Sequence, residues 1–241
     1  DCSKRLGIIG VEDWKGITKI PKIPKGINNV NDWVKNCISK SAQEIGVSRF
    51  EAILIHNPKD FIGENDKELL QSLKDLKERG LTKKIGVSVY EKKDLETILN
   101  IFQPEIVQCP VNIVDKRLLK DKYLQDISKM GIEVHIRSIF LQGLLTYATE
   151  NIPVEFAKFK DFWQNWKLWL SSQELTPVEA CVRFVNSIQG IDKIVIGVNS
   201  TLHLKEIFHY FSKPPIDKEP KWISDLEPEL IDPRLWKQNK T

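Results

Sequence analysis

Two short stretches, ITKIP at residues 17–21 and ILIHNP at residues 53–58, decide the fold that this sequence predicts. Each contains an apolar run of strand length, ends in a proline and carries one ionisable side chain, Lys19 or His56. In parallel sheets covered by helices, functional groups lie beyond the carboxyl ends of the strands. The two stretches therefore predict buried strands that present a lysine and a histidine at one edge of a parallel sheet.

Apolar runs of this kind alternate along the chain with segments of helical period, which predicts repeated strand–helix units. We expect six strands, at residues 14–20, 51–55, 84–89, 106–110, 133–138 and 193–197. We expect helices at residues 31–45, 66–79, 92–102, 117–129, 178–187 and 202–211. Helical segments are followed by glycines suited to left-handed caps, Gly46, Gly80, Gly131 and Gly190. The pattern predicts an α/β fold.

The longest connection, between residues 138 and 193, carries two further helical signals. Thr176 and Pro177 are suited to the N-cap and the first turn of a helix, and Glu179 would complete a capping box. An aromatic stripe at helical spacing precedes them, made of Phe162, Trp163, Trp166 and Trp169. Such a stripe could line a substrate pocket, but packing in the core is the favoured interpretation.

Length and composition favour one domain over residues 1–241. Residues 212–241 are expected to form a tail with a short helix, packed on the body through Trp222 and Trp236. The 36 basic and 33 acidic residues give a net charge of +3 and are interspersed, so nucleic-acid binding is not predicted. The four cysteines form no CxxC pair, which argues against a disulfide framework or zinc site. Without a long apolar run, no membrane association is predicted, and we expect a cytoplasmic protein.

Motifs at successive strand ends resemble those of the aldo-keto reductase family. They are ITKIP, LIHNP, GVSVY at residues 86–90, VQCPVN at 107–112, RSIFLQGLL at 137–145 and IGVNSTLHLKE at 196–206. The resemblance implies a (β/α)8 TIM barrel, with about six of its eight units in this chain. It also implies reduction of an aldehyde or ketone by hydride transfer from NADP(H), with NAD(H) as the alternative. No metal is implied.

By this resemblance, Lys19 and His56 are two members of a catalytic Tyr/Lys/His/Asp set. Without the family, the same two residues could equally be a solvated lysine and a capping histidine. In the catalytic reading, an ammonium group lowers the pKa of the proton-donating tyrosine, and the imidazole orients the carbonyl.

The resemblance also assigns residues to the cofactor. Ser88 and Gln108 would bind the nicotinamide carboxamide, and Arg137 stands where many relatives stack an aromatic ring. The loop expected to pass along the pyrophosphate contributes Ser138, Phe140, Gln142 and Gly143. The last strand–helix repeat contributes Gly197, Asn199, Ser200, His203 and Glu206. For a 2′-phosphate, relatives usually have a lysine or arginine near this helix, and the matching positions in this chain are Gly197 and His203. The acidic residue that matches Glu206 contacts the adenine in relatives. The family often has an asparagine directly after the residue that matches Ser88, and this chain has Val89 there.

The opening DCSKRLG resembles the fragment that follows the family's DTAxxYG segment. We therefore expect this chain to lack the first strand, its helix and the second strand, together with the catalytic aspartate and tyrosine. An open barrel would expose strand edges, so aggregation or dimerisation is a hypothesis. The alternative function is a non-catalytic nucleotide-binding or assembly subunit. The sequence predicts neither the carbonyl substrate nor the oligomeric state.

Overall fold

The computed structural model describes residues 2–11, 13–61, 66–223 and 226–236. Its strands are Ile17–Ile20 (β1), Phe50–Ile55 (β2), Thr82–Ser88 (β3), Ile106–Pro110 (β4), Glu133–Arg137 (β5) and Lys193–Ile194 (β6). Its α-helices are Cys2–Ile9 (α1), Val30–Ile45 (α2), Asp66–Glu78 (α3), Lys92–Leu99 (α4), Tyr123–Lys129 (α5), Lys160–Ser172 (α6), Pro177–Val185 (α7), Thr201–Phe211 (α8) and Pro228–Ile231 (α9). Short 3-10 turns are Pro58–Phe61 (η1), Lys120–Lys122 (η2), Leu144–Thr146 (η3), Thr149–Asn151 (η4), Val154–Phe159 (η5) and Pro233–Leu235 (η6).

All six predicted strands are present and form one sheet in chain order, β1 to β6. The β1–β2, β2–β3 and β3–β4 pairs are parallel. Helices follow most strands, as repeated βα units require. The predicted α/β fold with a parallel sheet is confirmed.

The chain separates into two compact units. The first comprises Asp1–Cys109 and Asp126–His135, and the second comprises Pro110–Gln125 and Ile136–Thr241. A single domain over residues 1–241 stays a prediction.

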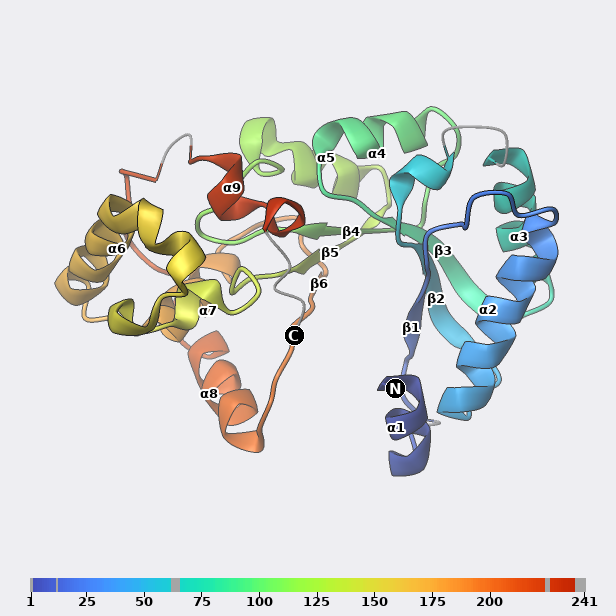
Figure 1. Ribbon diagram of the computed structural model, residues 1–241, viewed down its shortest axis with the longest axis horizontal. Helices are drawn as coiled ribbons and strands as arrows, with labels where there is room; N and C mark the ends of the chain where they lie inside the picture. The colour runs from blue at the N-terminus through green and yellow to red at the C-terminus, as the bar shows by residue number, and fades with distance from the viewer. Residues whose placement is uncertain (1, 12, 62–65, 224–225, 237–241) are drawn as a thin grey trace. The chain divides into compact units, whose positions relative to one another are not determined.

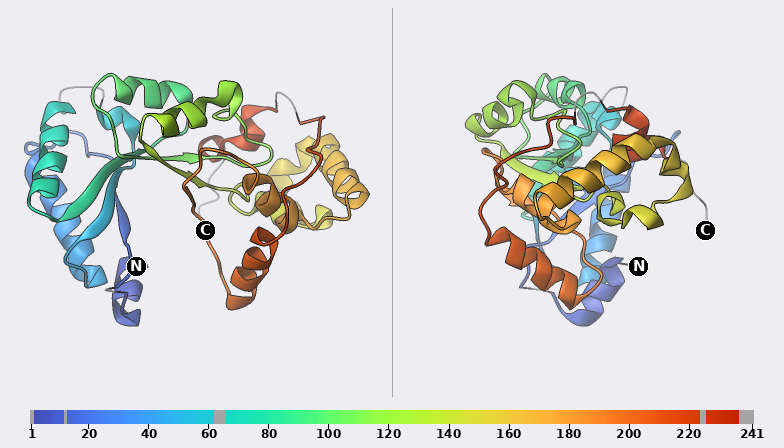
Figure 2. Two further views of the ribbon diagram at one scale, coloured as in Figure 1. Left: turned by 180° about the vertical axis from the view of Figure 1, so that it is seen from behind. Right: turned by 90° about the vertical axis from the view of Figure 1, so that its left-hand side faces the viewer.

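In the first unit, α2 packs on β1 and α3 packs on β3, while α1 and α3 each contact α2. Figure 1 shows α2 and α3 side by side along the outer face of β1 to β3, and Figure 2 shows the same layer from behind. The helices bury one apolar face each, for example Val34 on α2 and Leu73 on α3. Gly46 ends α2 with a φ of 82°, the left-handed conformation that its position predicts.

In the second unit, the aromatic stripe lies buried on α6, which confirms its packing role. The predicted start of α7 is also confirmed, because the Thr176 hydroxyl accepts the backbone N–H of Glu179 at 3.1 Å. The capping box is only half formed, however. The Glu179 carboxylate pairs with Arg183 and Lys213, at 3.0 and 2.9 Å, because these cations are within its reach.

The tail contains the expected short helix, α9. Trp222 packs edge-on against Phe162, with ring centroids 5.5 Å apart, and Trp236 packs against Phe156 at 4.7 Å. Both predicted tryptophan anchors are confirmed. Residues 224, 225 and 237–241 of the predicted tail lie outside the described residues.

The predicted helix over residues 117–129 is wrong in its first half. Only α5, from Tyr123, is α-helical, and Asp121 and Lys122 have φ values of 56° and 58°. In the same segment, Arg117 is held by two carboxylates. Its guanidinium binds both carboxylate oxygens of Asp115, at 2.8 and 2.9 Å, and that of Asp232 at 3.3 Å. These contacts hold the segment in an irregular loop.

No helix within the described residues has both the length and the apolar character needed to cross a bilayer.

Candidate active and cofactor-binding site

Lys19 and His56 lie at the carboxyl ends of neighbouring strands in the first unit. Lys19 is the third residue of β1 and stands opposite Leu54 of β2. His56 follows β2 directly, and its backbone N–H donates to the carbonyl of Ile20 at 3.1 Å. The Lys19 side chain is half-buried, whereas His56 is exposed. A lysine and an accessible imidazole thus share one edge of the sheet, as the sequence predicts.

Ser88 and Gln108 continue this edge along β3 and β4. The two residues are directly opposite in the parallel register. Both are buried, yet neither Ser88 Oγ nor Gln108 Oε1 has a hydrogen-bond partner among the described residues. Buried polar atoms without partners are costly, and in native proteins they mark a binding group, water or a functional role. These two atoms are therefore a candidate recognition point for a polar ligand.

A chain of ionisable side chains links β3 and β5. Lys84 of β3 forms an ion pair with Glu133 of β5, and Glu133 accepts a hydrogen bond from His135 Nε2 at 2.8 Å. The backbone N–H of Glu133 donates to the carbonyl of Glu105, and this parallel spacing sets His135 opposite Gln108. His135 is 1% exposed and its Nδ1 has no partner among the described residues.

The electrostatics of this chain favour a charged glutamate. Burial opposes ionisation of Glu133, but hydrogen bonds from His135 and Lys84 hold its pKa at about 2. The pKa of Lys84 is raised, chiefly by its hydrogen bond to Glu133. Because Glu133 accepts from Nε2, the imidazole Nδ1 is available for a second hydrogen bond on the sheet face.

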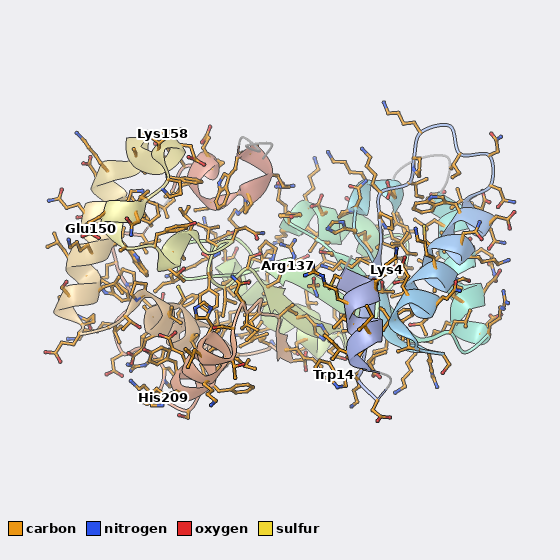
Figure 3. All side chains as sticks on the ribbon, turned by 60° about the horizontal axis from the view of Figure 1, so that its bottom comes forward. Lys4, Trp14, Arg137, Glu150, Lys158 and His209 are labelled. Atoms are coloured by element: carbon orange, nitrogen blue, oxygen red, sulfur yellow. The ribbon has the colours of Figure 1, made fainter. Side chains whose placement is uncertain are left out.

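The second unit contains a cavity of about 750 Å³. Most of the residues that the sequence assigns to the cofactor line it, namely Arg137, Ser138, Phe140, Gln142, Gly143, Gly197, Asn199, His203 and Glu206. Arg137 projects from the end of β5 and is labelled in Figure 3. Cavities of this volume suit drug-sized or cofactor-sized ligands.

One wall of the cavity is a loop with unusual backbone geometry. Ser138, Leu141 and Gln142 have φ values of 59°, 48° and 56°, and Gly143 follows at 88°. Left-handed conformations at non-glycine residues each cost about 1 kcal/mol and gather at functional sites. The turn is held in part by Asn112, whose side-chain amide donates to the Ser138 carbonyl at 3.1 Å. The protein therefore fixes this loop before any ligand binds.

The opposite wall comes from the segment that enters α8. Ser200 does not line the cavity. It is the N-cap of α8, and its hydroxyl accepts the His203 backbone N–H at 3.2 Å. A Cβ built on Gly197 would meet nothing within 4 Å. The cap fixes the start of α8, while the cavity beside Gly197 remains open.

Sequence reasoning missed several participants. The apolar part of the cavity lining was not predicted, because aliphatic side chains carry no chemical signature; it consists of Ile139, Val178, Val195, Ile196 and Ile207. His135 was also missed. A signal existed, since Glu133, His135 and Arg137 occupy alternate positions of an apolar strand, and alternate residues share one face.

Comparisons with known proteins identify the family and the fold. The family model described as the aldo/keto reductase family matches residues 14–222. No curated protein gave a sequence match. Among solved structures, the apo form of an aldo-keto reductase from Bacillus halodurans is similar over 99% of this chain and 80% of its own, with 15% identity and a TM-score of 0.68.

Two further structures give the same result. The holo form from Bacillus halodurans has 14% identity and a TM-score of 0.65, with the same coverage of both chains. A thermostable aldo-keto reductase in complex with the inhibitor epalrestat has 17% identity and a TM-score of 0.67, over 92% of this chain and 76% of its own. At these identities the likeness concerns the fold, and the six strands match those of (β/α)8 barrels.

Proposed function

Because the chain belongs to the aldo/keto reductase family, whose members are oxidoreductases, we propose that it serves the NAD(P)H-dependent reduction of an aldehyde or ketone. The observation that carries the proposal is the cavity of the second unit. Residues assigned to the cofactor from three separate stretches, near 137–143, at 197–199 and on α8, line one space of about 750 Å³. Residues that merely resembled a motif would have no reason to share a cavity.

A nicotinamide cofactor fits the polar groups of this chain. A carboxamide offers both N–H donors and a carbonyl acceptor, which suits Ser88 Oγ and Gln108 Oε1, two atoms without a partner among the residues that the structure describes. The turn at residues 138–143 and the start of α8 would hold phosphates, since helix N-termini favour negative charge. When bound, the cofactor would supply the hydride.

Lys19 and His56 supply the polar chemistry at the strand edge. His56 is exposed directly after β2, and its imidazole would donate a hydrogen bond to the substrate carbonyl and orient it. The ammonium of Lys19 would favour the ionised form of a neighbouring proton donor. The motif match assigns that donor to no tyrosine of this chain. We propose a small carbonyl compound as substrate and a cytoplasmic location.

A second candidate is a nucleotide-binding subunit without turnover. It is favoured by the observation that the cavity is formed wholly by residues of the second unit. Cofactor binding could therefore persist without any contribution from Lys19 or His56. The two candidates differ in one measurable property, which is carbonyl-dependent oxidation of the reduced cofactor.

The test is calorimetric titration of the full chain with NADH and NADPH, followed by turnover assays with a panel of aldehydes and ketones. We expect binding of at least one cofactor and carbonyl-dependent oxidation of it. Binding without oxidation of either cofactor would support the second candidate. Absence of binding by both cofactors would contradict the two candidates together.

A substitution then tests the role of the strand edge. His56→Ala should lower kcat by about 10² to 10⁴ and leave the cofactor Kd unchanged, because it removes a group that acts on the carbonyl. His209→Ala is the matched control, since His209 is an exposed histidine of α8 that does not line the cavity. Equal turnover in both variants would remove His56 from the mechanism.

A further inference from the structure

A second hollow of about 410 Å³ lies in the second unit, apart from the cavity described above. Four residues on one face of α6 line it, Trp166, Lys167, Leu170 and Ser171, and we call it the α6 groove. Its other walls come from segments 147–150 and 174–177, which precede and follow that helix. No residue of the described chain lines both hollows, so the α6 groove is a separate place for a ligand.

The α6 groove is lined by a buried hydrogen-bond donor that lacks an acceptor. Trp166 is 3% exposed, and its indole Nε1 has no hydrogen-bond partner among the residues that the structure describes. An indole nitrogen can only donate a hydrogen bond. Leu170, which is also buried, lines the groove with an aliphatic side chain that accepts none. Because an unpaired buried donor is costly, a ligand in the groove should bring an acceptor to Trp166.

The rim of the α6 groove is polar and carries an excess of negative charge. Lys167 Nζ and Glu150 Oε1 form an ion pair at 3.2 Å that joins α6 to η4, and Glu150 is labelled in Figure 3. Glu174 is a second, exposed carboxylate of the lining. The exposed side chains of Tyr147 and Ser171 add hydroxyl groups. Among the described lining residues, two carboxylates thus oppose one ammonium at neutral pH, which disfavours an anionic ligand.

Glu174 stands at a helix end where a glycine is usual. Its φ is 53°, and the backbone N–H of Leu175 donates to the Leu170 carbonyl at 3.0 Å, a hydrogen bond typical of helix ends with a left-handed residue. A residue with a side chain costs free energy in this conformation, and such residues gather at functional sites. Glycine would therefore suit the helix end better, whereas glutamate supplies a carboxylate to the rim of the α6 groove.

These groups together match the chemistry of a sugar. The C–H face of a sugar ring can pack on aromatic and aliphatic side chains, and its hydroxyl groups both accept and donate hydrogen bonds. An organic ammonium ion would suit the carboxylates but has no acceptor for the indole N–H. We propose that the α6 groove binds an uncharged sugar or a related cyclic polyol, with Trp166 Nε1 donating to a ligand oxygen and Glu174 accepting from a ligand hydroxyl. The site needs neither cofactor nor turnover and is independent of the proposed function.

The experiment follows the indole N–H signals of the isotopically labelled full chain by nuclear magnetic resonance, without nicotinamide cofactor. The probes are D-glucose, D-galactose and myo-inositol. We expect at least one of them to shift the Trp166 signal saturably, and this signal is identified by its loss in Trp166→Phe. Cyclohexanol, a ring with a single hydroxyl, and glucose 6-phosphate, an anion, should each bind at least about threefold more weakly than that probe.

Substitutions assign the contacts. Trp166→Phe keeps an aromatic ring without the donor and should raise the Kd of the bound probe by about tenfold. Trp169→Phe is the matched control, since that ring stacks on Trp166 at 5.3 Å between centroids but does not line the groove. Glu174→Gly should also raise the Kd, yet the variant should unfold at a higher urea concentration because glycine relieves the left-handed strain. A purely structural role of Glu174 would not separate binding from stability in this way.

Each outcome bears on the proposal. Absence of a saturable shift with all three probes would leave Trp166 Nε1 to water and overturn the inference, while the proposed function would stand. Cyclohexanol or glucose 6-phosphate binding as tightly as the best probe would overturn the ligand class. Equal affinities of Trp166→Phe and Trp169→Phe would remove the indole donor from the site. If Trp166→Phe does not fold, unchanged or tighter binding by Glu174→Gly would overturn the proposed contacts.

Discussion

A methyl group added at Gly86 of the first unit and one added at Gly197 of the second would meet very different surroundings. At Gly86, a Cβ would come within 2.4 Å of the Ile106 carbonyl oxygen and 2.5 Å of a Leu54 methyl carbon. At Gly197, it would meet nothing within 4 Å. Gly86 lets two strands approach closely, whereas Gly197 lies beside open space in the lining of the cavity.

The polar groups of the two units differ in the same way. In the first unit, Lys84, Glu133 and His135 are joined in one chain across the sheet face, and only His135 Nδ1 of this chain lacks a partner among the described residues. In the second, the ionisable groups of the cavity wall face a space of about 750 Å³. The difference is between paired charges on β3 and β5 and ionisable groups that line a cavity. Substitutions can test that division.

The largest effect is expected at the crowded glycine. Gly86→Ala should lower the free energy of unfolding by about 3 kcal/mol, because the obstructing atom at 2.4 Å belongs to the backbone and cannot move aside easily. Gly197→Ala should change it by no more than about 0.5 kcal/mol. Urea denaturation of both variants measures the difference. Similar stability of the two alanine variants would show that the contrast between the units is not real.

The second effect concerns Glu133 and depends on pH. Its pKa is about 2 in the folded protein and 4.5 ordinarily, so the folded state binds fewer protons than the unfolded state between these values. The stabilisation is therefore fully present above about pH 4.5 and is lost as the pH falls toward about 2. Glu133→Gln should cost on the order of 2 kcal/mol at neutral pH, and the difference from the unsubstituted chain should shrink on acidification.

Urea denaturation at several pH values checks this expectation. Glu96→Gln serves as the control, because the carboxylate of Glu96 is exposed and forms a helical pair with Lys92, at 3.7 Å. That variant should behave like the unsubstituted chain at every pH. A cost for Glu133→Gln that stays constant down to pH 3 would mean that the carboxylate charge is not what stabilises the sheet face.

The smallest effect is expected at a helix cap beside the cavity. Thr176→Ala should cost about 1 kcal/mol, since it removes the hydroxyl that accepts the Glu179 backbone N–H. Thr201→Ala is the matched control, because Thr201 is an exposed first residue of α8 rather than its cap. Thermal unfolding of the two variants compares them. Equal stabilities would show that the cap contributes nothing to the second unit.

Many of the strands and helix ends could be predicted from sequence because they depend on local patterns. The apolar run before His56 and the glycine at position 46 mark a strand and a helix end without reference to distant residues. The helix predicted from residue 117 failed for the opposite reason. Its first half is interrupted by the left-handed residues Asp121 and Lys122, and Arg117 pairs with Asp232, which lies 115 residues away and cannot be seen in a local pattern.

The candidate site was predicted unevenly. The positions of Lys19 and Gly197 came from the order of motifs along the chain, whereas the role of Ser200 as a helix cap became clear only from its hydrogen bond to His203. The alternation of residues along a strand does not reveal how the side chain of His135 is paired. Its place in a strand was predictable, but its pairing with Glu133 depends on which ring nitrogen faces which carboxylate oxygen.

The buried aromatic stripe also has an optical consequence. Five of the seven tryptophans, at positions 163, 166, 169, 222 and 236, belong to the second unit. The rings of Trp166 and Trp169 are stacked with centroids 5.3 Å apart and planes inclined by 23°, close enough for their electronic transitions to couple. Near-ultraviolet circular dichroism would therefore be dominated by the unit that contains the cavity. Order in the binding unit can thus be followed in the intact chain without any label.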